Sequence, residues 1–187
     1  VIGVDMTPEQ LEIAQRHRAW HADRFGLSAS NVDFRLGQAE DLRAAGIEDG
    51  SVDVVISNCV INLSPDKRRV FSEILRVLAP GGELYFADVF ADRRLPEQAR
   101  RDETAVGECL GGALYVEDFR RLMGQLGVAD VRRVTRSRVD VTDEPVRRVV
   151  GPAAFWSITY RAFKLDLEDR CEDYGQVVRY LGTIEES

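Results

Sequence analysis

The stretch Val52-Asp53-Val54-Val55-Ile56-Ser57-Asn58-Cys59 decides the fold. Four of its first five residues are apolar and β-branched. A short, nearly continuous run of such residues is typical of a strand covered on both faces, as strands are in a parallel sheet. Open α/β sheets bind ligands beyond the carboxyl ends of their strands, so we expect Asn58 and Cys59 at the ligand-binding edge.

Strands and helices alternate on both sides of this stretch. The first predicted helix begins at Pro8, a residue suited to the first helical position, and Thr7 is expected to cap it. Alternation of this kind predicts an α/β fold with a mostly parallel sheet, right-handed crossovers and helices on both faces. The further elements are predicted strands at 1–4, 32–36 and 83–88 and a helix that opens at Ser64-Pro65-Asp66.

The pattern changes in the C-terminal half of the chain. A charged, helical stretch is predicted at 95–109, a break at Gly111-Gly112 and an amphipathic helix at 117–126. Residues 128–141 and 154–164 then alternate apolar and polar side chains, which is the period of strands with one face in water. We therefore expect an antiparallel tail to the sheet, followed by one more candidate strand at 176–180.

Composition narrows the class of protein. The 187 residues carry 25 Lys and Arg against 32 Asp and Glu, a net charge of −7. An acidic chain is a poor partner for nucleic acid, which is held by clustered basic residues. The longest apolar runs are too short to cross a bilayer, so no membrane partner is expected. Three cysteines and no N-terminal signal segment predict a reducing, cytoplasmic setting.

Two acidic residues follow successive predicted strands. Asp5 ends the first strand, where a carboxylate can accept hydrogen bonds from both hydroxyls of a ribose. Glu40 lies in the loop after the second strand, where it can hold an adenine edge beside the backbone of Ala39. Each residue alone reads equally well as a surface carboxylate. Together they favour the adenosine side of a nucleoside pocket.

Thiols are the remaining candidates for chemistry. Cys59 follows a strand directly, and Cys109 lies near glycines that allow close backbone approach, so both are candidates to face one pocket. Cysteine is more often simply a small buried apolar residue, and Cys171 is the weaker candidate. His17 and His21 have the spacing of a zinc pair on a helix, but no third ligand is near, so we read them as solvated surface.

Four motifs resemble those of arsenite methyltransferases, which belong to the class I, S-adenosylmethionine-dependent methyltransferases. The two that contain cysteine are the most specific, whereas the Pro-Gly-Gly turn is shared by many methyltransferases. The resemblance covers essentially the whole chain. The motifs are Val1-Ile2-Gly3-Val4-Asp5-Met6-Thr7, Ser57-Asn58-Cys59-Val60-Ile61-Asn62-Leu63-Ser64-Pro65-Asp66-Lys67, Pro80-Gly81-Gly82-Glu83-Leu84-Tyr85-Phe86 and Gly107-Glu108-Cys109-Leu110-Gly111-Gly112-Ala113-Leu114-Tyr115.

The resemblance implies a Rossmann-like sheet, a cofactor and roles for particular residues. Trivalent arsenic is soft, so thiolates suit it as ligands. Methyl transfer needs positioning more than proton chemistry, which fits a chain with two His. The implied partners are arsenite or its thiol conjugates and a thiol reductant such as glutathione or thioredoxin. The implied oligomeric state is a monomer. The implied site residues are Cys59 and Cys109 for arsenic, with Asp5, Met6, Ala39, Glu40 and Asn58 for S-adenosylmethionine.

The resemblance also implies a boundary and an absent part. Residues 1–143 would form a partial methyltransferase domain, and 144–187 a C-terminal extension that is a candidate to cover the substrate. The family's first strand, its glycine-rich loop and a further cysteine lie upstream of Val1, and that strand would run between those at Val1 and Val52. We therefore expect the isolated chain to bind cofactor poorly. A methyltransferase for another small metabolite, or a non-catalytic arsenic-binding module, remain the alternatives.

Overall fold

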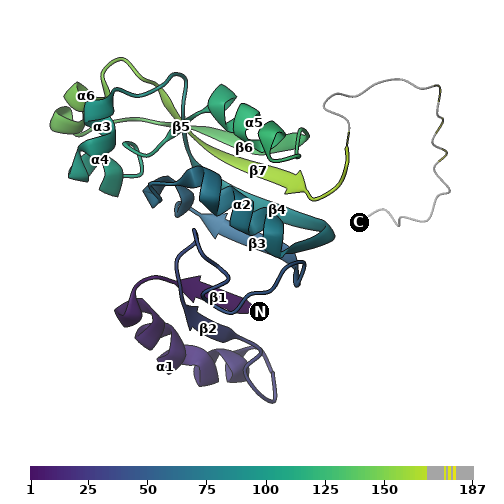
Figure 1. The fold of residues 1–187 in the computed structure, drawn as a ribbon. Coiled ribbons are helices and arrows are strands. Elements are labelled where there is room, and N and C mark those ends of the chain that lie inside the picture. The colour runs from purple at the N-terminus through teal and green to yellow at the C-terminus, as the bar shows by residue number, and fades with distance from the viewer. Residues whose placement is uncertain (168–174, 176, 178, 180–187) are drawn as a thin grey trace.

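The computed structural model describes residues 1–167, 175, 177 and 179. The predicted strand at 176–180 falls largely outside the described residues, and Cys171 does so entirely. The elements, shown in Figure 1, are β1 (Ile2–Asp5), α1 (Pro8–Arg24), β2 (Asp33–Leu36), β3 (Val52–Asn58), η1 (Ile61–Leu63), α2 (Lys67–Val77), β4 (Leu78–Ala91), α3 (Glu97–Arg101), α4 (Glu103–Gly107), β5 (Leu114–Tyr115), α5 (Val116–Gln125), β6 (Val131–Val139), α6 (Glu144–Val150) and β7 (Phe155–Phe163).

The N-terminal unit is a strand, a helix and a parallel strand. β1 and β2 pair in parallel, with Ile2 opposite Asp33 and Asp5 opposite Leu36. Helix α1 begins at Pro8 as predicted, but the predicted cap is wrong, because the Thr7 side chain makes no cap hydrogen bond. Instead, Asp5 Oδ1 accepts a hydrogen bond from the Thr7 backbone N–H at 2.8 Å and so fixes the turn into the helix.

The larger sheet has the order β3-β4-β7-β6, and β5 adds to the end of β4. β3 and β5 run parallel to β4, whereas β7 is antiparallel to β4 and to β6. In Figure 1, the arrows of β1, β2 and β3 point the same way, so their carboxyl ends share one side of the molecule. This arrangement confirms the predicted Rossmann-like fold with a mostly parallel sheet and an antiparallel tail.

The main core lies between the sheet and the helices α2 and α5 (Figure 1). Its centre is aromatic: the rings of Phe71, Phe86, Phe119 and Tyr160 lie 4.9–6.1 Å from one another where they pair. Aromatic pairs at such separations add to the stabilisation from burial itself. A smaller cluster of Leu42, Ile47 and Val77, with Val4, Val52 and Val55 packed against it, links the N-terminal unit to the larger sheet.

Three local expectations need correction. β3 is not covered on both faces, because the side chain of Ile56 is 76% exposed and that of Val54 52%. The predicted helix at 95–109 is broken into α3 and α4 at Asp102, whose side chain accepts from the backbone N–H of Ala105 and caps the second helix. The strand predicted at 83–88 is longer, since β4 runs through the Pro-Gly-Gly turn to Ala91.

Two features of the sheets bear on the predicted domain organisation of the chain. Within residues 1–167, no hydrogen-bonded pairing joins β1 to β3, and the expectation of a strand between them stays a prediction. β7 lies in the predicted extension 144–187, yet the sheet places it between β4 and β6. Among the described helices, none is both long and apolar enough to cross a membrane.

Candidate active site

Cys59 lies directly after β3, at the carboxyl edge of the sheet. Its backbone N–H donates to the carbonyl of Ala87 at 2.9 Å, which continues the pairing of β3 with β4 by one residue. The chain then turns sharply, because Cys59 has φ 53°. This left-handed conformation is uncommon for a residue with a Cβ and is found preferentially where function requires it. The turn leaves the Cys59 side chain exposed.

Cys109 also has a left-handed backbone, with φ 59°. It follows the C-terminus of α4, where its N–H donates to the carbonyl of Val106 and that of Leu110 donates to Ala105, each at 2.9 Å. These two bonds form a Schellman motif, in which the residue at the Cys109 position is usually glycine. Within the described residues, Cys59 and Cys109 are the only non-glycine residues at positive φ.

The two cysteines meet although 50 residues separate them in the chain. The thiol of Cys109 lies 3.6 Å from the carbonyl oxygen of Cys59 and is placed to donate a hydrogen bond to it. Burial, and then the negative charge of Asp88, raises the pKa of Cys109 to about 11 and raises that of Cys59. Both side chains are free thiols, and because their pKa values are raised they are protonated at neutral pH.

Asp88 and Asn62 lie beneath the thiols. Asp88 is 1% exposed, and its carboxylate accepts hydrogen bonds from the backbone N–H groups of Asn62 at 3.1 Å and Val89 at 2.9 Å. Asn62 is 3% exposed, and its side-chain amide donates to the carbonyls of Val89 at 2.7 Å and Cys109 at 3.2 Å. These bonds tie the Cys109 loop to the end of β4.

The glycine pair after Cys109 allows this close packing. A Cβ on Gly112 would lie 1.9 Å from the carbonyl oxygen of Asn62, and one on Gly111 would lie 2.5 Å from that of Ala99. Neither distance is compatible with a side chain. Glycine at 112 therefore lets the Cys109 segment pack against the turn that contains Asn62, and glycine at 111 lets it pack against α3.

The predicted cofactor residues lie on the N-terminal side of the same edge. Asp5 ends β1 and is exposed, and its carbonyl accepts from the N–H of Gly37 at 3.0 Å, which keeps the ends of β1 and β2 together. Met6 follows and is 68% exposed. Asn58 is exposed at the end of β3, next to Cys59.

Glu40 and Ala39 lie in the loop after β2 and are anchored to α2. The Glu40 carboxylate accepts a hydrogen bond from the hydroxyl of Ser64, and its carbonyl accepts from Arg69 Nε at 2.8 Å. Ala39 packs against the main core. Part of the Glu40 side chain is therefore already engaged by the segment that leads from Cys59 into α2.

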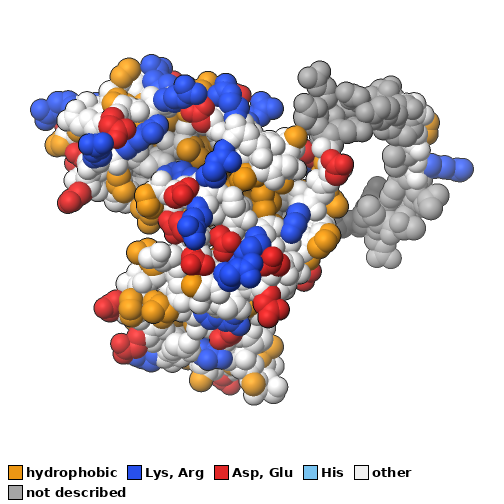
Figure 2. All heavy atoms as spheres, viewed as in Figure 1, with side chains coloured by type: hydrophobic (Ala, Val, Ile, Leu, Met, Phe, Trp, Pro, Cys, Tyr) orange, Lys and Arg blue, Asp and Glu red, His pale blue; other side chains and the backbone are white. Residues whose placement is uncertain are grey.

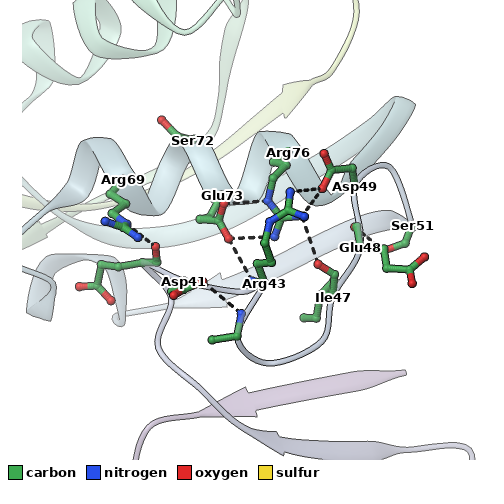
Figure 3. Close-up of polar contacts among 12 residues, drawn as sticks. Asp41, Arg43, Ile47, Glu48, Asp49, Ser51, Arg69, Ser72, Glu73 and Arg76 are labelled. Carbon is green, nitrogen blue, oxygen red and sulfur yellow. Dashed lines mark hydrogen bonds and ion pairs between the residues drawn. The ribbon is translucent and has the colours of Figure 1, made fainter.

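An ion-pair network holds the following segment, 41–51, against α2. Figure 3 shows Arg76 between Glu73 and Asp49, at 2.7 Å and 2.6 Å. Arg76 lowers the pKa of Glu73 and that of Asp49, mainly through these hydrogen bonds. Figure 2 shows acidic and basic side chains mixed over this part of the surface. The network fixes the segment that follows Ala39 and Glu40.

A cleft of about 520 Å³ adjoins the site on the side of α3 and α5. Asn62, Gly111 and Gly112 line it, whereas neither cysteine does. Among the described residues, no group of three or more His, Cys, Asp or Glu is arranged to hold a metal ion. The arrangement at the sheet edge offers two convergent thiols next to a region with exposed acidic and amide groups.

Comparison with known proteins agrees with this geometry. Residues 1–129 match the family described as "Methyltransferase domain". The chain belongs to this family. It is 55% identical over 185 residues to the arsenite methyltransferase of Aquipseudomonas alcaligenes, a match that covers 98% of this chain and 53% of the relative. It is 45% identical over 164 residues to the arsenite methyltransferase of Homo sapiens, which covers 88% and 44%.

Solved structures agree with the assignment of this chain to a methyltransferase domain. An arsenic (III) S-adenosylmethionine methyltransferase from Chlamydomonas reinhardtii superimposes with a TM-score of 0.87 at 53% identity, over 94% of this chain and 59% of that one. The YcgJ protein of a Bacillus species, with a TM-score of 0.60 at 17% identity over 88% and 82%, shows the fold alone. The chain spans about half the length of the curated relatives it matches.

Sequence reasoning missed two residues of this site, Asn62 and Asp88. Asn62 stands inside the motif that contains Cys59, and Asp88 only ends the strand predicted at 83–88. Their contacts join segments 26–47 residues apart, so no local pattern marks them. A usable signal was the Gly111-Gly112 pair, since adjacent glycines indicate that another backbone approaches closely.

Proposed function

We propose that the whole protein transfers a methyl group from S-adenosylmethionine to trivalent arsenic held by Cys59 and Cys109, and so detoxifies arsenite. The observation that carries the proposal is the meeting of two free thiols from distant segments, each on a left-handed backbone. The names of the similar proteins support the same activity. A left-handed backbone at a non-glycine residue destabilises the fold, and such strain is found mainly at functional sites. Two such cysteines that lie close together therefore favour a joint role for their sulfur atoms.

The thiols suit arsenite in their protonated form. When As(OH)₃ reacts with two thiols, two As–S bonds form, two As–O bonds break, and each thiol proton leaves with a hydroxide as water. No general base is needed, which fits the raised pKa values of Cys59 and Cys109. A soft ion such as trivalent arsenic favours this sulfur ligation over oxygen.

The cofactor fits the residues at the N-terminal side of the edge. S-adenosylmethionine, when bound, supplies the electrophilic methyl group. An exposed carboxylate at the end of a strand suits the two hydroxyls of a ribose, and we assign that role to Asp5, with Met6 beside it. Ala39 and Glu40 would contact the adenine, and Asn58 would lie near the methionine end. The fixed loop after β2 keeps this side pre-organised.

The remaining parts of the reaction are also proposals. Transfer of the methyl group to the arsenic lone pair raises arsenic from the trivalent to the pentavalent state. A thiol reductant such as glutathione or thioredoxin then supplies two electrons that reduce arsenic to the trivalent state. The reductant is itself oxidised to a disulfide. We propose that the protein acts as a monomer in the cytoplasm, because free thiols persist in a reducing compartment. Helix α6 of the predicted extension 144–187 packs in the apolar cluster that Cys109 joins, which supports a substrate-covering role.

The test is methyl transfer by the whole protein with arsenite and labelled S-adenosylmethionine. Cys59→Ser and Cys109→Ser, made singly, should each abolish transfer while the Kd for S-adenosylmethionine stays within about twofold. Retained transfer to arsenite in either variant would contradict the claim that both thiols hold the arsenic, and no transfer to arsenite by a wild type that methylates another small metabolite would point to that metabolite as substrate. Arsenite binding without any transfer by the wild type would indicate a binding module.

A further inference from the structure

Asn62 lies where the two cysteine segments meet. It sits in η1, three residues after Cys59, and it is almost completely buried. Buried side-chain amides normally have all their hydrogen-bonding groups engaged. The bonds of Asn62 run to two different segments, so this residue connects parts of the site that the chain itself does not join.

The contacts of Asn62 fix both sides of the thiol pair. On one side, its backbone N–H donates to Asp88 and its amide to the carbonyl of Val89, which anchors the turn after Cys59 to the end of β4. On the other side, the same amide nitrogen donates to the carbonyl of Cys109 itself. Loss of the amide would leave the Cys109 carbonyl and the Val89 carbonyl without this donor.

Two further contacts hold Asn62 in place. Lys67 Nζ donates to its carbonyl oxygen at 3.3 Å, and Gly112 packs so closely against that oxygen that no side chain fits. The residue therefore has little freedom to move without moving Cys109. A shape-matched core residue would fill the same volume, but it would not link Cys59 and Cys109.

We infer that Asn62 is a positioning residue that sets the separation of the Cys59 and Cys109 thiols and thereby the affinity for trivalent arsenic. The inference rests on the proposed function for its ligand. It acts through the carbonyl of Cys109, not by contact with arsenic. Its prediction is that loss of the amide weakens two-thiol binding much more than it weakens the fold.

The test compares Asn62→Asp and Asn62→Ser with the control Ile61→Val in the whole protein. Asn62→Asp keeps the shape but sets a carboxylate oxygen against the two carbonyls, and Asn62→Ser keeps the fold accessible should the first variant unfold. Ile61 is buried in the same turn, and its side chain makes no link to Cys109. The probe is phenylarsine oxide, which binds two thiols at once, and a second readout is disulfide formation between Cys59 and Cys109 by diamide.

Both Asn62 variants should bind phenylarsine oxide roughly 10- to 100-fold more weakly and form the disulfide more slowly, since misplacement by about 1 Å has effects of this size. Their affinity for S-adenosylmethionine should stay unchanged, and Ile61→Val should match the wild type in both thiol readouts. Wild-type affinity for the arsenical in a folded Asn62 variant would overturn the inference. If the wild type forms the disulfide readily, the Asn62 variants do so slowly and no form binds arsenicals, the proposed function fails while the positioning role stands.

Discussion

Replacement of Cys109 by glycine should relieve the backbone strain at this position while it removes the proposed arsenic ligand. At φ 59°, a residue with a Cβ pays about 1–2 kcal/mol that glycine does not. Glycine in turn costs about 0.5–1 kcal/mol more to order than alanine. With the middle of each range, Cys109→Gly should therefore be roughly 0.75 kcal/mol more stable than Cys109→Ala, the variant that keeps the Cβ but lacks the thiol.

Thermal unfolding of the two variants measures this difference. For a protein of about 150–250 residues, 1 kcal/mol corresponds to a change of roughly 2–4 °C in Tm, so Cys109→Gly should unfold roughly 1–4 °C above Cys109→Ala. Cys59, with φ 53°, should behave in the same way.

Glu108 provides the matched control, because it is the neighbouring residue but has φ −77°. Glu108→Gly should be less stable than Glu108→Ala, the opposite order. If Cys109→Gly is no more stable than Cys109→Ala, the left-handed backbone is not a source of strain. A functional requirement would then no longer be needed to explain a cysteine at this position.

Three other perturbations have defined outcomes. Because the pKa of Cys109 is raised to about 11, its alkylation by iodoacetamide should keep accelerating with pH up to about 11, and a plateau by pH 9 would contradict the burial described. Gly112→Ala should lower the free energy of unfolding in urea by about 1–3 kcal/mol or more, since its Cβ would overlap the Asn62 carbonyl; an unchanged midpoint would contradict that contact. Arg76 lowers the pKa of Glu73, so this pair stabilises the fold above the ordinary Glu73 value of 4.5 and ceases to do so as pH falls through the lowered folded pKa. Arg76→Met should therefore flatten the acid limb of the Tm–pH profile, and an identical profile would refute the coupling.

Hydrophobic period and turn chemistry were sufficient to predict most of the fold. The continuous run in β3 and the alternation in β6 and β7 identified parallel and antiparallel strands correctly. Period alone could not show that one face of β3 is exposed at Ile56, because that depends on what packs against the strand. It also could not show that Asp102 caps a second helix within 95–109.

The site was predictable in part. The position of Cys59 after a strand and the glycines near Cys109 indicated both thiols, and the structure brings them together. The left-handed backbone of each was not predictable, since cysteine carries no preference for it. The roles of Asn62 and Asp88 could not be predicted from the sequence, because their contacts form only when distant segments fold together.

X-ray absorption at the arsenic edge tests the central claim most directly. Arsenite bound to the whole wild-type protein should show at least two sulfur neighbours, and Cys59→Ser and Cys109→Ser should each remove one of them. An arsenic atom surrounded by oxygen alone, or a sulfur count that one of these substitutions leaves unchanged, would contradict the claim that both thiols hold the same arsenic.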